Sequence, residues 1–317
     1  MTTDITVCGG AGFIGGHLLR ALAADRADQI RFLVHRRDPC AGLAAAVPVP
    51  GDLLRPESLR EVITPGCTVI NLAYLAGHSQ GENLAAVTNL ARTCRAVRAR
   101  RLVHVSTATV VGAAPDDVIT ESTAPDPRDE YERTKLEIER RLTEEARNAF
   151  ELVILRPTAV FGPSGENLVT LAAGLVTGTM AANYARSCIH GRRRMNLVCV
   201  NNVVAAIRFA ATVRVTAGAE TFLVSDDDDE LNNYRDVESL LRARLGCGTY
   251  PVPPLPLPEV VLRAVLKLRG RSNVNPNRRY SASRLTSSGF RRPTALAAGL
   301  AAFADWYRQT RARANQA

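Results

Sequence analysis

The sequence predicts an α/β fold in which helices cover both faces of a doubly wound parallel sheet. Two observations support this: short apolar runs alternate with longer helical patterns through the first two-thirds of the chain, and a glycine-rich segment joins the first run to the first helix. The predicted strands are residues 5–8, 30–35, 47–49, 68–72, 102–106 and 152–156. The helices predicted between them are residues 17–24, 57–62, 83–99 and 131–148.

The glycine-rich segment reads CGGAGFIGG and satisfies the spacing GxxGxxG through Gly9, Gly12 and Gly15. Glycine permits a sharp turn, lets the backbone approach a pyrophosphate, and lets the helix pack closely on its strand. The segment, which includes Phe13 and Ile14 as candidate cofactor-binding residues, leads into the helix predicted from residue 17, and its free N–H groups and the helix N-terminus face the anion. The segment therefore predicts a Rossmann dinucleotide-binding domain, and a glycine-rich turn without a ligand is the alternative.

The chain length allows one large domain or two interleaved ones. Of its 317 residues 46% are hydrophobic and 22% are charged, which is ordinary for a folded protein with a core. The strand and helix alternation loosens after Pro157, and a proline-rich stretch spans residues 251–258. We expect a dinucleotide-binding domain at residues 1–160 and a smaller α/β substrate lobe at residues 161–317, with about residues 196–225 returning to the first domain.

Composition argues against several classes of partner. The longest apolar runs, such as residues 168–176, are shorter than the ~20 residues that span a bilayer, and the N-terminus lacks a secretory signal, so a cytoplasmic protein without membrane binding is expected. The seven cysteines are scattered without a CxxC pair, which predicts free thiols and no metal site. The net charge is +9, but the arginines are dispersed, so we expect no nucleic acid; a phosphate-bearing small molecule or solubility alone explains the charge.

Two segments of the second half allow more than one interpretation. The acidic run at residues 226–230 resembles a metal site, but adjacent carboxylates on a loop usually form a solvated turn, and we expect the turn. The amphipathic residues 260–268 could lie on a membrane surface, and packing against the core is the favoured interpretation.

Two further places agree with a dinucleotide. The second predicted strand ends in His35, Arg36 and Arg37, where an acidic residue would bind the ribose 2′-hydroxyl of NAD(H). Basic groups there favour NADP(H), with NAD(H) as the alternative if these are ordinary surface arginines. The third strand is followed by Asp52 and Leu53, whose side chains could meet the amino group and the face of the adenine.

Tyr131 and Lys135 are spaced so that both lie on one face of a predicted helix. The pattern YxxxK is weak alone, but here it follows a strand that ends in VSTATVVG, in a chain with a phosphate loop. A tyrosine with a pKa near ~10 is a poor acid–base catalyst at neutral pH. A cation about 4 Å away, at an effective dielectric constant of ~20, contributes on the order of 4 kcal/mol. We therefore expect Lys135 to lower the pKa of Tyr131.

With these residues the chain resembles an extended short-chain dehydrogenase/reductase of the NAD(P)-dependent epimerase/dehydratase family, many of whose members modify nucleoside-diphosphate sugars. The resemblance covers nearly the whole length, from the glycine loop and Tyr131/Lys135 to the segments GDL, NLA, VST, TES, LRP, FGP and GFRRP. It implies that Thr107 hydrogen-bonds the reacting oxygen, Tyr131 transfers its proton and Lys135 holds the nicotinamide ribose. It also implies that Ala73 and Pro157 line the cofactor site.

Departures from the family pattern limit the choice of reaction. Val111, Ala159 and Asn202 stand where the family usually has Tyr, Asn and Asp, which affects the expected sugar contacts. In the family's sugar 4,6-dehydratases an Asp-Glu pair follows the active-site Thr, whereas Ala108 and Thr109 follow it here, so dehydration is not expected.

Reduction is the expected reaction. We expect an NADPH-dependent reductase of a nucleotide-linked 4-keto sugar, and a nucleotide-sugar 4-epimerase with tightly bound NAD is the alternative. A non-sugar ketone, or a cofactor-binding sensor without catalysis, stays open. Arg193, Arg194 and Arg279 are candidates for binding the substrate diphosphate, with surface charge as the alternative for each. Relatives of this kind are often homodimers.

Overall fold

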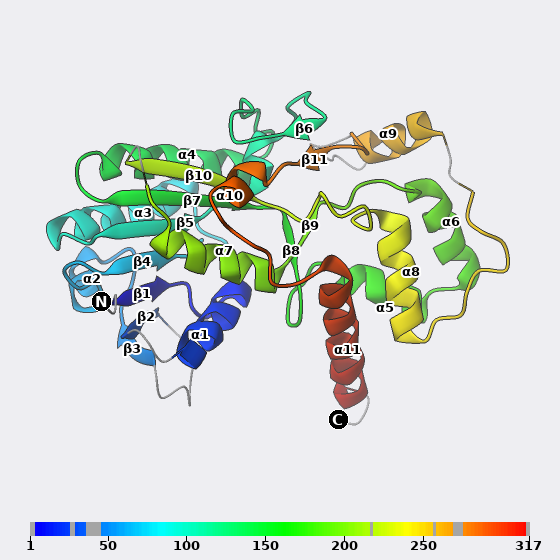
Figure 1. The fold of residues 1–317 in the computed structure, drawn as a ribbon, viewed down its shortest axis with the longest axis horizontal. Helices are drawn as coiled ribbons and strands as arrows, with labels where there is room; N and C mark the ends of the chain where they lie inside the picture. Colours follow the sequence, from blue (N-terminus) through cyan, green and yellow to red (C-terminus); the bar gives the residue numbers. More distant parts are fainter. Residues whose placement is uncertain are drawn as a thin grey trace.

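The computed structural model describes residues 4–25, 29–35, 46–215, 218–255, 258–268 and 275–314. Within them, seven strands form a sheet of the order β10-β7-β5-β4-β1-β2-β3, and all neighbouring strands are parallel (Figure 1). The strands are β1 (Ile5–Cys8), β2 (Ile30–Val34), β3 (Ala46–Pro50), β4 (Thr68–Asn71), β5 (Arg101–Val105), β7 (Glu151–Pro157) and β10 (Ala219–Val224). The strand order reverses between β1 and β4, and ligands of such sheets bind beyond the carboxyl ends of the strands at this point.

Helices cover both faces of the sheet. The first face carries α1 (Phe13–Asp25) and α7 (Val200–Thr212), and the second carries α2 (Pro56–Val62), α3 (Gln80–Ala96) and α4 (Glu130–Ala146). Val103 and Val105 of β5 join the core under α1 and α7, whereas Leu102 joins the core under α3 and α4. Because side chains alternate along a strand, His104 lies on the α3 and α4 side as well.

Some of the remaining elements lie beside the sheet, and the others form the end of the molecule away from it. Figure 1 shows α5, α6, α8 and α11 gathered at that end, where Phe161, Val237, Leu300 and Phe303 belong to a separate core. The elements are η1 (Ala108–Val111), β6 (Val118–Ile119), β8 (Ala159–Phe161), α5 (Val169–Thr177), α6 (Met180–His190), β9 (Leu197–Cys199), α8 (Tyr234–Leu245), α9 (Glu259–Leu268), β11 (Arg279–Tyr280), α10 (Ser283–Ser287) and α11 (Leu296–Ala314).

The predicted α/β fold with a parallel sheet is confirmed, and the element boundaries differ by a few residues. The helix predicted from residue 83 begins at Gln80, because Ser79 and Glu82 form a reciprocal cap: the Glu82 N–H donates to Ser79 Oγ over 3.2 Å, and the Ser79 N–H donates to Glu82 Oε2 over 2.8 Å. The helix predicted from residue 17 begins at Phe13. The division at residue 160 stays a prediction.

The expectation of a solvated turn at residues 226–230 is wrong for the first two residues. Asp226 and Asp227 are only 2% and 1% exposed. The Cys199 N–H donates to Asp226 over 3.0 Å, and the Tyr280 N–H donates to Asp227 over 2.8 Å. Backbone donors from distant segments replace water around these carboxylates, and burial raises the pKa of Asp227 to about 6.

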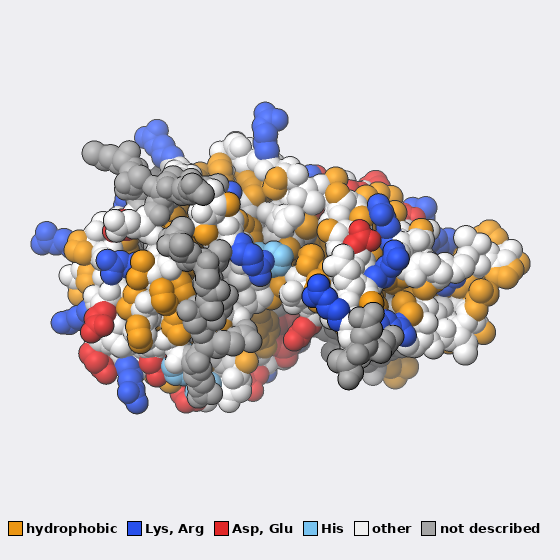
Figure 2. All heavy atoms as spheres, turned by 90° about the horizontal axis from the view of Figure 1, so that it is seen from below, with side chains coloured by type: hydrophobic (Ala, Val, Ile, Leu, Met, Phe, Trp, Pro, Cys, Tyr) orange, Lys and Arg blue, Asp and Glu red, His pale blue; other side chains and the backbone are white. Residues whose placement is uncertain are grey.

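The surface agrees with a dispersed charge. On the face in Figure 2, Lys and Arg side chains are scattered over the described residues and do not gather into one stripe. On α9, Leu262 is buried, but Val260 and Leu268 are 76% and 88% exposed, so the expected core packing of residues 260–268 holds only at Leu262 among these three. No helix in the described part of the chain is long and apolar enough to cross a bilayer.

Candidate active site

The glycine-rich segment forms a tight loop between β1 and α1. Gly9 has a φ of +85°, and a Cβ there would lie 2.7 Å from the Ala73 nitrogen, so a side chain does not fit. A Cβ on Gly15 would lie 2.7 Å from the Gly10 Cα, because α1 packs closely on the loop. A Cβ on Gly12 would meet nothing nearer than 3.4 Å, so the space beside its Cα is open to a ligand. Turn, close packing and open backbone are the three roles that the spacing predicts.

A hollow of about 740 Å³ opens beside this loop. Gly12, Phe13, His17, Arg20 and Glu166 are among the residues that line it. The first N–H groups of a helix have no partner within the helix and carry its positive end. Together with the guanidinium of Arg20, the N-terminus of α1 therefore favours an anion such as a pyrophosphate.

The predicted adenosine-binding residues lie at the ends of β2 and β3. His35 Nε2 is 3.7 Å from Asp52 Oδ2, and Leu53 is buried directly after Asp52. Arg36 and Arg37 lie outside the described residues. The structure thus brings His35 and Asp52 together, and their contacts with a nucleotide stay a prediction.

The end of β4 is shaped by the side chain of Asn71. Its Oδ1 accepts a hydrogen bond from the Ala73 N–H over 3.0 Å, and its Nδ2 lies 3.2 Å from Nδ1 of His104. This turn brings Ala73 against Gly9 of the phosphate loop, and the cofactor role of Ala73 stays a prediction. Pro157, the other predicted lining residue, is the last residue of β7.

The two predicted catalytic hydroxyls lie together. Thr107 follows β5 and caps η1, and its Oγ1 accepts a hydrogen bond from the Thr109 N–H over 3.2 Å. Tyr131 lies in the first turn of α4, which Asp129 caps by accepting from the Glu132 N–H over 2.7 Å. The side chain of Thr107 acts on the phenol of Tyr131, whose pKa it lowers.

The pKa of Tyr131 is raised, not lowered. Burial is the main cause, Tyr74 and Asp129 raise the pKa further, and the hydrogen bond with Thr107 lowers it. Lys135 Nζ lies 6.0 Å from the centre of the Tyr131 ring. Tyr131 is 42% exposed, so its burial is partial, and Lys135 is not among the groups that shift its pKa. The expected lowering of the Tyr131 pKa by Lys135 is therefore not found in this arrangement.

Lys135 is buried on the sheet side of α4. Only 4% of it is exposed, and burial lowers its pKa to about 8 while Glu139 acts in the opposite direction. Glu139 follows one turn later and pairs with Arg156 of β7 over 2.5 Å. This pair holds α4 on the sheet and so fixes where Tyr131 and Lys135 lie.

Tyr74 belongs to the same cluster, although the sequence analysis did not single it out. Its ring centre lies 5.2 Å from that of Tyr131, and Lys135 Nζ lies over its face at 5.0 Å. The signal in the sequence is an aromatic residue directly after Asn71-Leu72-Ala73, at the carboxyl end of a central strand.

The three arginines predicted to bind the substrate diphosphate contact other residues of the chain. Arg194 is 8% exposed and lies 2.6 Å from Glu230, and Arg279 lies 3.5 Å from the same carboxylate. The carbonyl oxygen of Arg193 accepts a hydrogen bond from the Tyr234 N–H over 2.9 Å. These contacts organise the second half of the chain, and the binding of substrate by the three arginines stays a prediction.

The model of the NAD dependent epimerase/dehydratase family matches residues 5–224, from β1 to the end of β10. The chain belongs to this family. It is 30% identical over 175 residues to sterol demethylase protein B of Methylococcus capsulatus and 28% identical over 168 residues to the 4-hydroxy-2-methyl-3-oxo-4-farnesyl-3,4-dihydroquinoline-1-oxide ketoreductase of Stigmatella aurantiaca. These matches cover 51% and 49% of the chain, and the chain spans about half the length of both relatives, 52% and 50%. The solved structure of MoeE5 in complex with UDP-glucuronic acid and NAD is 25% identical, with a TM-score of 0.69 over 97% of this chain and 99% of MoeE5.

The residues of this epimerase/dehydratase family member fit a nicotinamide dinucleotide. The glycine loop leaves open backbone and a hollow at the N-terminus of α1. Within the described part of the chain, the buried ammonium of Lys135 makes no hydrogen bond or ion pair and lies against the rings of Tyr74 and Tyr131. A ribose hydroxyl supplies the kind of acceptor that this ammonium needs.

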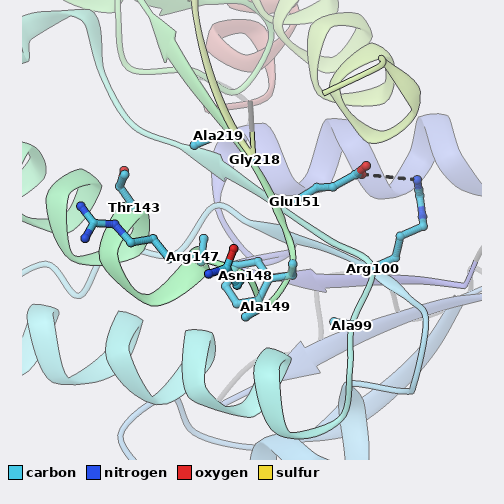
Figure 3. Close-up of a pocket in the computed structure, with 11 residues that line it drawn as sticks. Ala99, Arg100, Thr143, Arg147, Asn148, Ala149, Glu151, Gly218 and Ala219 are labelled. Atoms are coloured by element: carbon cyan, nitrogen blue, oxygen red, sulfur yellow. Dashed lines mark ion pairs between the residues drawn. The ribbon is translucent and has the colours of Figure 1, made fainter. Parts of the chain in front are cut away.

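A second hollow, of about 760 Å³, lies at the amino ends of the strands, opposite the end of the sheet that carries the glycine loop. Figure 3 shows Arg100 and Glu151, paired at 3.8 Å, among the residues that line it, together with Gly218 and Ala219. These residues stand at the amino ends of β5, β7 and β10, whereas Thr107 follows the carboxyl end of β5. This hollow is therefore separate from the candidate active site.

Proposed function

We propose that the chain is an NADPH-dependent ketoreductase that reduces a 4-keto sugar carried by a nucleoside diphosphate. The observation that carries the proposal is the grouping of the Thr107 and Tyr131 side chains beside the ammonium of Lys135. All three stand at the carboxyl edge of the parallel sheet, the edge that also carries the glycine loop.

Each of the three residues has a part in ketone reduction. A bound reduced nicotinamide would supply a hydride to the keto carbon. Tyr131 would donate its proton to the oxygen as negative charge develops there, and Thr107 would donate a second hydrogen bond to the same oxygen. The ammonium of Lys135 would hold the ribose and stabilise the tyrosinate that remains.

The residues after Thr107 argue against elimination of water. Ala108 is apolar and Thr109 bonds to Thr107 over 3.1 Å between the two hydroxyl oxygens. Neither side chain is a carboxylic acid or a carboxylate, the groups that would protonate a leaving hydroxyl and remove a carbon-bound proton. Reduction needs a hydride, which a bound reduced nicotinamide would supply, and one proton, which Tyr131 would donate.

The preference for NADPH rests on the basic segment after β2. His35, Arg36 and Arg37 would face a 2′-phosphate, where a carboxylate would repel it. The proposed substrate class follows the likeness to MoeE5, whose solved complex contains UDP-glucuronic acid. The relative from Stigmatella aurantiaca is named as a ketoreductase of a farnesylated quinoline oxide, so polycyclic ketones form the competing class.

Cofactor and substrate are tested in one series. Purified protein is first examined by mass spectrometry for carried-over nucleotide and then titrated with NADPH and NADH by fluorescence. Oxidation of NADPH is next followed with nucleoside-diphosphate 4-keto sugars, the same sugars without the nucleotide, and polycyclic ketones. We expect an empty protein, at least tenfold tighter binding of NADPH, and turnover of the nucleotide-linked sugars. Turnover of polycyclic ketones instead would contradict the substrate class, and no turnover by any ketone would contradict the reaction.

A second candidate is a nucleotide-sugar 4-epimerase, and the likeness to an NAD complex favours it. Such an enzyme oxidises and re-reduces one carbon, so its cofactor stays bound and is not consumed. Retained NAD in the purified protein, and interconversion of two UDP-sugars without added cofactor, would select this candidate over the reductase.

A further inference from the structure

Tyr74 stands between β4 and α3, in a segment whose backbone is held on both sides. On one side the Ala73 N–H donates to Asn71 Oδ1 over 3.0 Å. On the other side the Leu75 N–H donates to Asn83 Oδ1 over 2.9 Å, and Asn83 Nδ2 donates to the Leu75 carbonyl over 3.2 Å. Asn83 is 2% exposed, so these bonds are shielded from water. The backbone on both sides of Tyr74 is therefore fixed by these bonds.

This ring contacts both predicted catalytic side chains of α4. Lys135 Nζ lies 5.0 Å from the centre of the Tyr74 ring, closer than the 6.0 Å to the Tyr131 ring. The planes of Tyr74 and Tyr131 meet at 81° with their centres 5.2 Å apart, which is the favourable edge-to-face arrangement. A cation within about 6 Å of an aromatic face is attracted to it, most strongly where water is excluded. Lys135 is 4% exposed, so most of its side chain is shielded from water.

Two other titratable groups near Lys135, Glu139 and His104, do not take the place of the Tyr74 ring as its partner. Glu139 favours the charged lysine, but its carboxylate is already bound to Arg156 over 2.5 Å. His104 of β5 is fully buried, and burial lowers its pKa well below its usual value with a smaller effect from Lys135, so its ring is neutral at physiological pH. The face of Tyr74 is thus the nearest aromatic partner that the structure gives the ammonium.

We propose that Tyr74 is a positioning residue, whose ring face keeps the Lys135 ammonium charged and in place and whose contact with Tyr131 fixes the orientation of that phenol. Its importance for turnover rests on the proposed function, whereas its effect on Lys135 does not. The aromatic ring of Tyr74 carries this role, and the hydroxyl does not. Phenylalanine at position 74 therefore preserves the role, whereas an aliphatic residue of similar bulk does not.

The lysine content of the chain makes this directly measurable. Lys135 and Lys267 are its two lysines, so protein labelled with ¹³C at the lysine ε-carbon gives one signal for each, and the exposed Lys267 serves as an internal control. The pKa of Lys135 is measured by NMR in the wild type and in Tyr74→Phe, Tyr74→Leu and Tyr74→Met. Tyr184→Leu is the matched control, because Tyr184 makes a similar edge contact, with Tyr250, on the other half of the chain.

We expect Tyr74→Phe to keep the wild-type pKa of Lys135, and Tyr74→Leu and Tyr74→Met to lower it by about one unit. Lys267 and the Tyr184→Leu protein should not change. The proposal is overturned if the aliphatic variants keep the wild-type value, or if Tyr74→Phe behaves as they do, since the hydroxyl would then be the active group. With a ketone that the wild type reduces as substrate, kcat should fall at least tenfold in Tyr74→Leu and keep its wild-type value in Tyr74→Phe. Failure of the wild type to reduce any ketone would contradict the proposed function and leave the NMR comparison intact.

Discussion

Glu139 and Arg156 form an ion pair that is buried on both sides. Oε2 of Glu139 lies 2.5 Å from Nη2 of Arg156, and the side chains are 5% and 9% exposed. The pair joins α4 to β7 one turn beyond Lys135. It therefore helps to fix the register of the two candidate catalytic residues on that helix.

Removing the charge of Glu139 should destabilise the protein strongly. In Glu139→Gln the guanidinium of Arg156 would stay buried without a counter-ion, which costs about 3–5 kcal/mol of unfolding free energy. Urea denaturation measures this loss. The control is Glu137→Gln, which removes an exposed pair with Arg140 at 3.6 Å and should change stability by no more than about 0.5 kcal/mol. Equal effects of the two variants would show that the buried pair does not hold α4.

A methyl group on Gly15 should abolish binding of the dinucleotide. In Gly15→Ala the new Cβ would meet the Gly10 backbone at 2.7 Å, so α1 must move away from the loop. We expect the dissociation constant for NADPH, measured by fluorescence, to rise at least 100-fold. Gly248→Ala is the control, because a Cβ there meets nothing within 4 Å. Unchanged binding by Gly15→Ala would place the dinucleotide elsewhere.

Lys135 should make stability depend on alkaline pH. Its pKa is lowered by burial from 10.5 to about 8 in the folded chain, so the fold buries a charge below pH 8 and loses that charge first as pH rises. Between pH 8 and 10.5 the unfolded chain binds more protons, and the free energy of unfolding should rise by up to about 3 kcal/mol from this group.

Comparison with Lys135→Met isolates this effect from the tyrosines and cysteines that titrate in the same range. The difference in unfolding free energy, wild type minus variant, should become more favourable to the wild type from pH 8 to 10.5. A difference that stays constant over that range would mean that Lys135 keeps its usual pKa in the folded protein.

The parts of the site that the sequence predicts are those that depend on local patterns of residues. The loop from Gly9 to Gly15 shows its turn, its close packing and its open backbone within a few residues. Tyr131 and Lys135 share a helix face, which spacing alone reveals. The parallel sheet follows from the alternation of strands and helices, and the strand order agrees with the doubly wound pattern.

The parts that the sequence does not predict depend on contacts between distant segments. Tyr74 reaches Tyr131 across 57 positions, and no spacing rule connects the end of β4 to the start of α4. Asp226 and Asp227 have the composition of a solvated turn, but their donors at Cys199 and Tyr280 are 27 and 53 positions away. The local spacing predicts a lowered pKa for Tyr131 because it shows the cation of Lys135 and does not show the partial burial of the phenol or the neighbouring Tyr74, which come from the fold.

Deuterium transfer from 4-deuterated NADPH to the keto carbon of a substrate tests the proposed reaction most directly. With the wild type, mass spectrometry should find one deuterium in each product molecule. Tyr131→Phe should bind NADPH within about threefold of the wild type and transfer deuterium at least 100-fold more slowly, since the proton donor is missing. Tyr184→Phe, which alters a tyrosine outside the site, should keep the wild-type rate. A product without deuterium, or a Tyr131→Phe protein with near-normal turnover, would contradict hydride transfer assisted by Thr107, Tyr131 and Lys135.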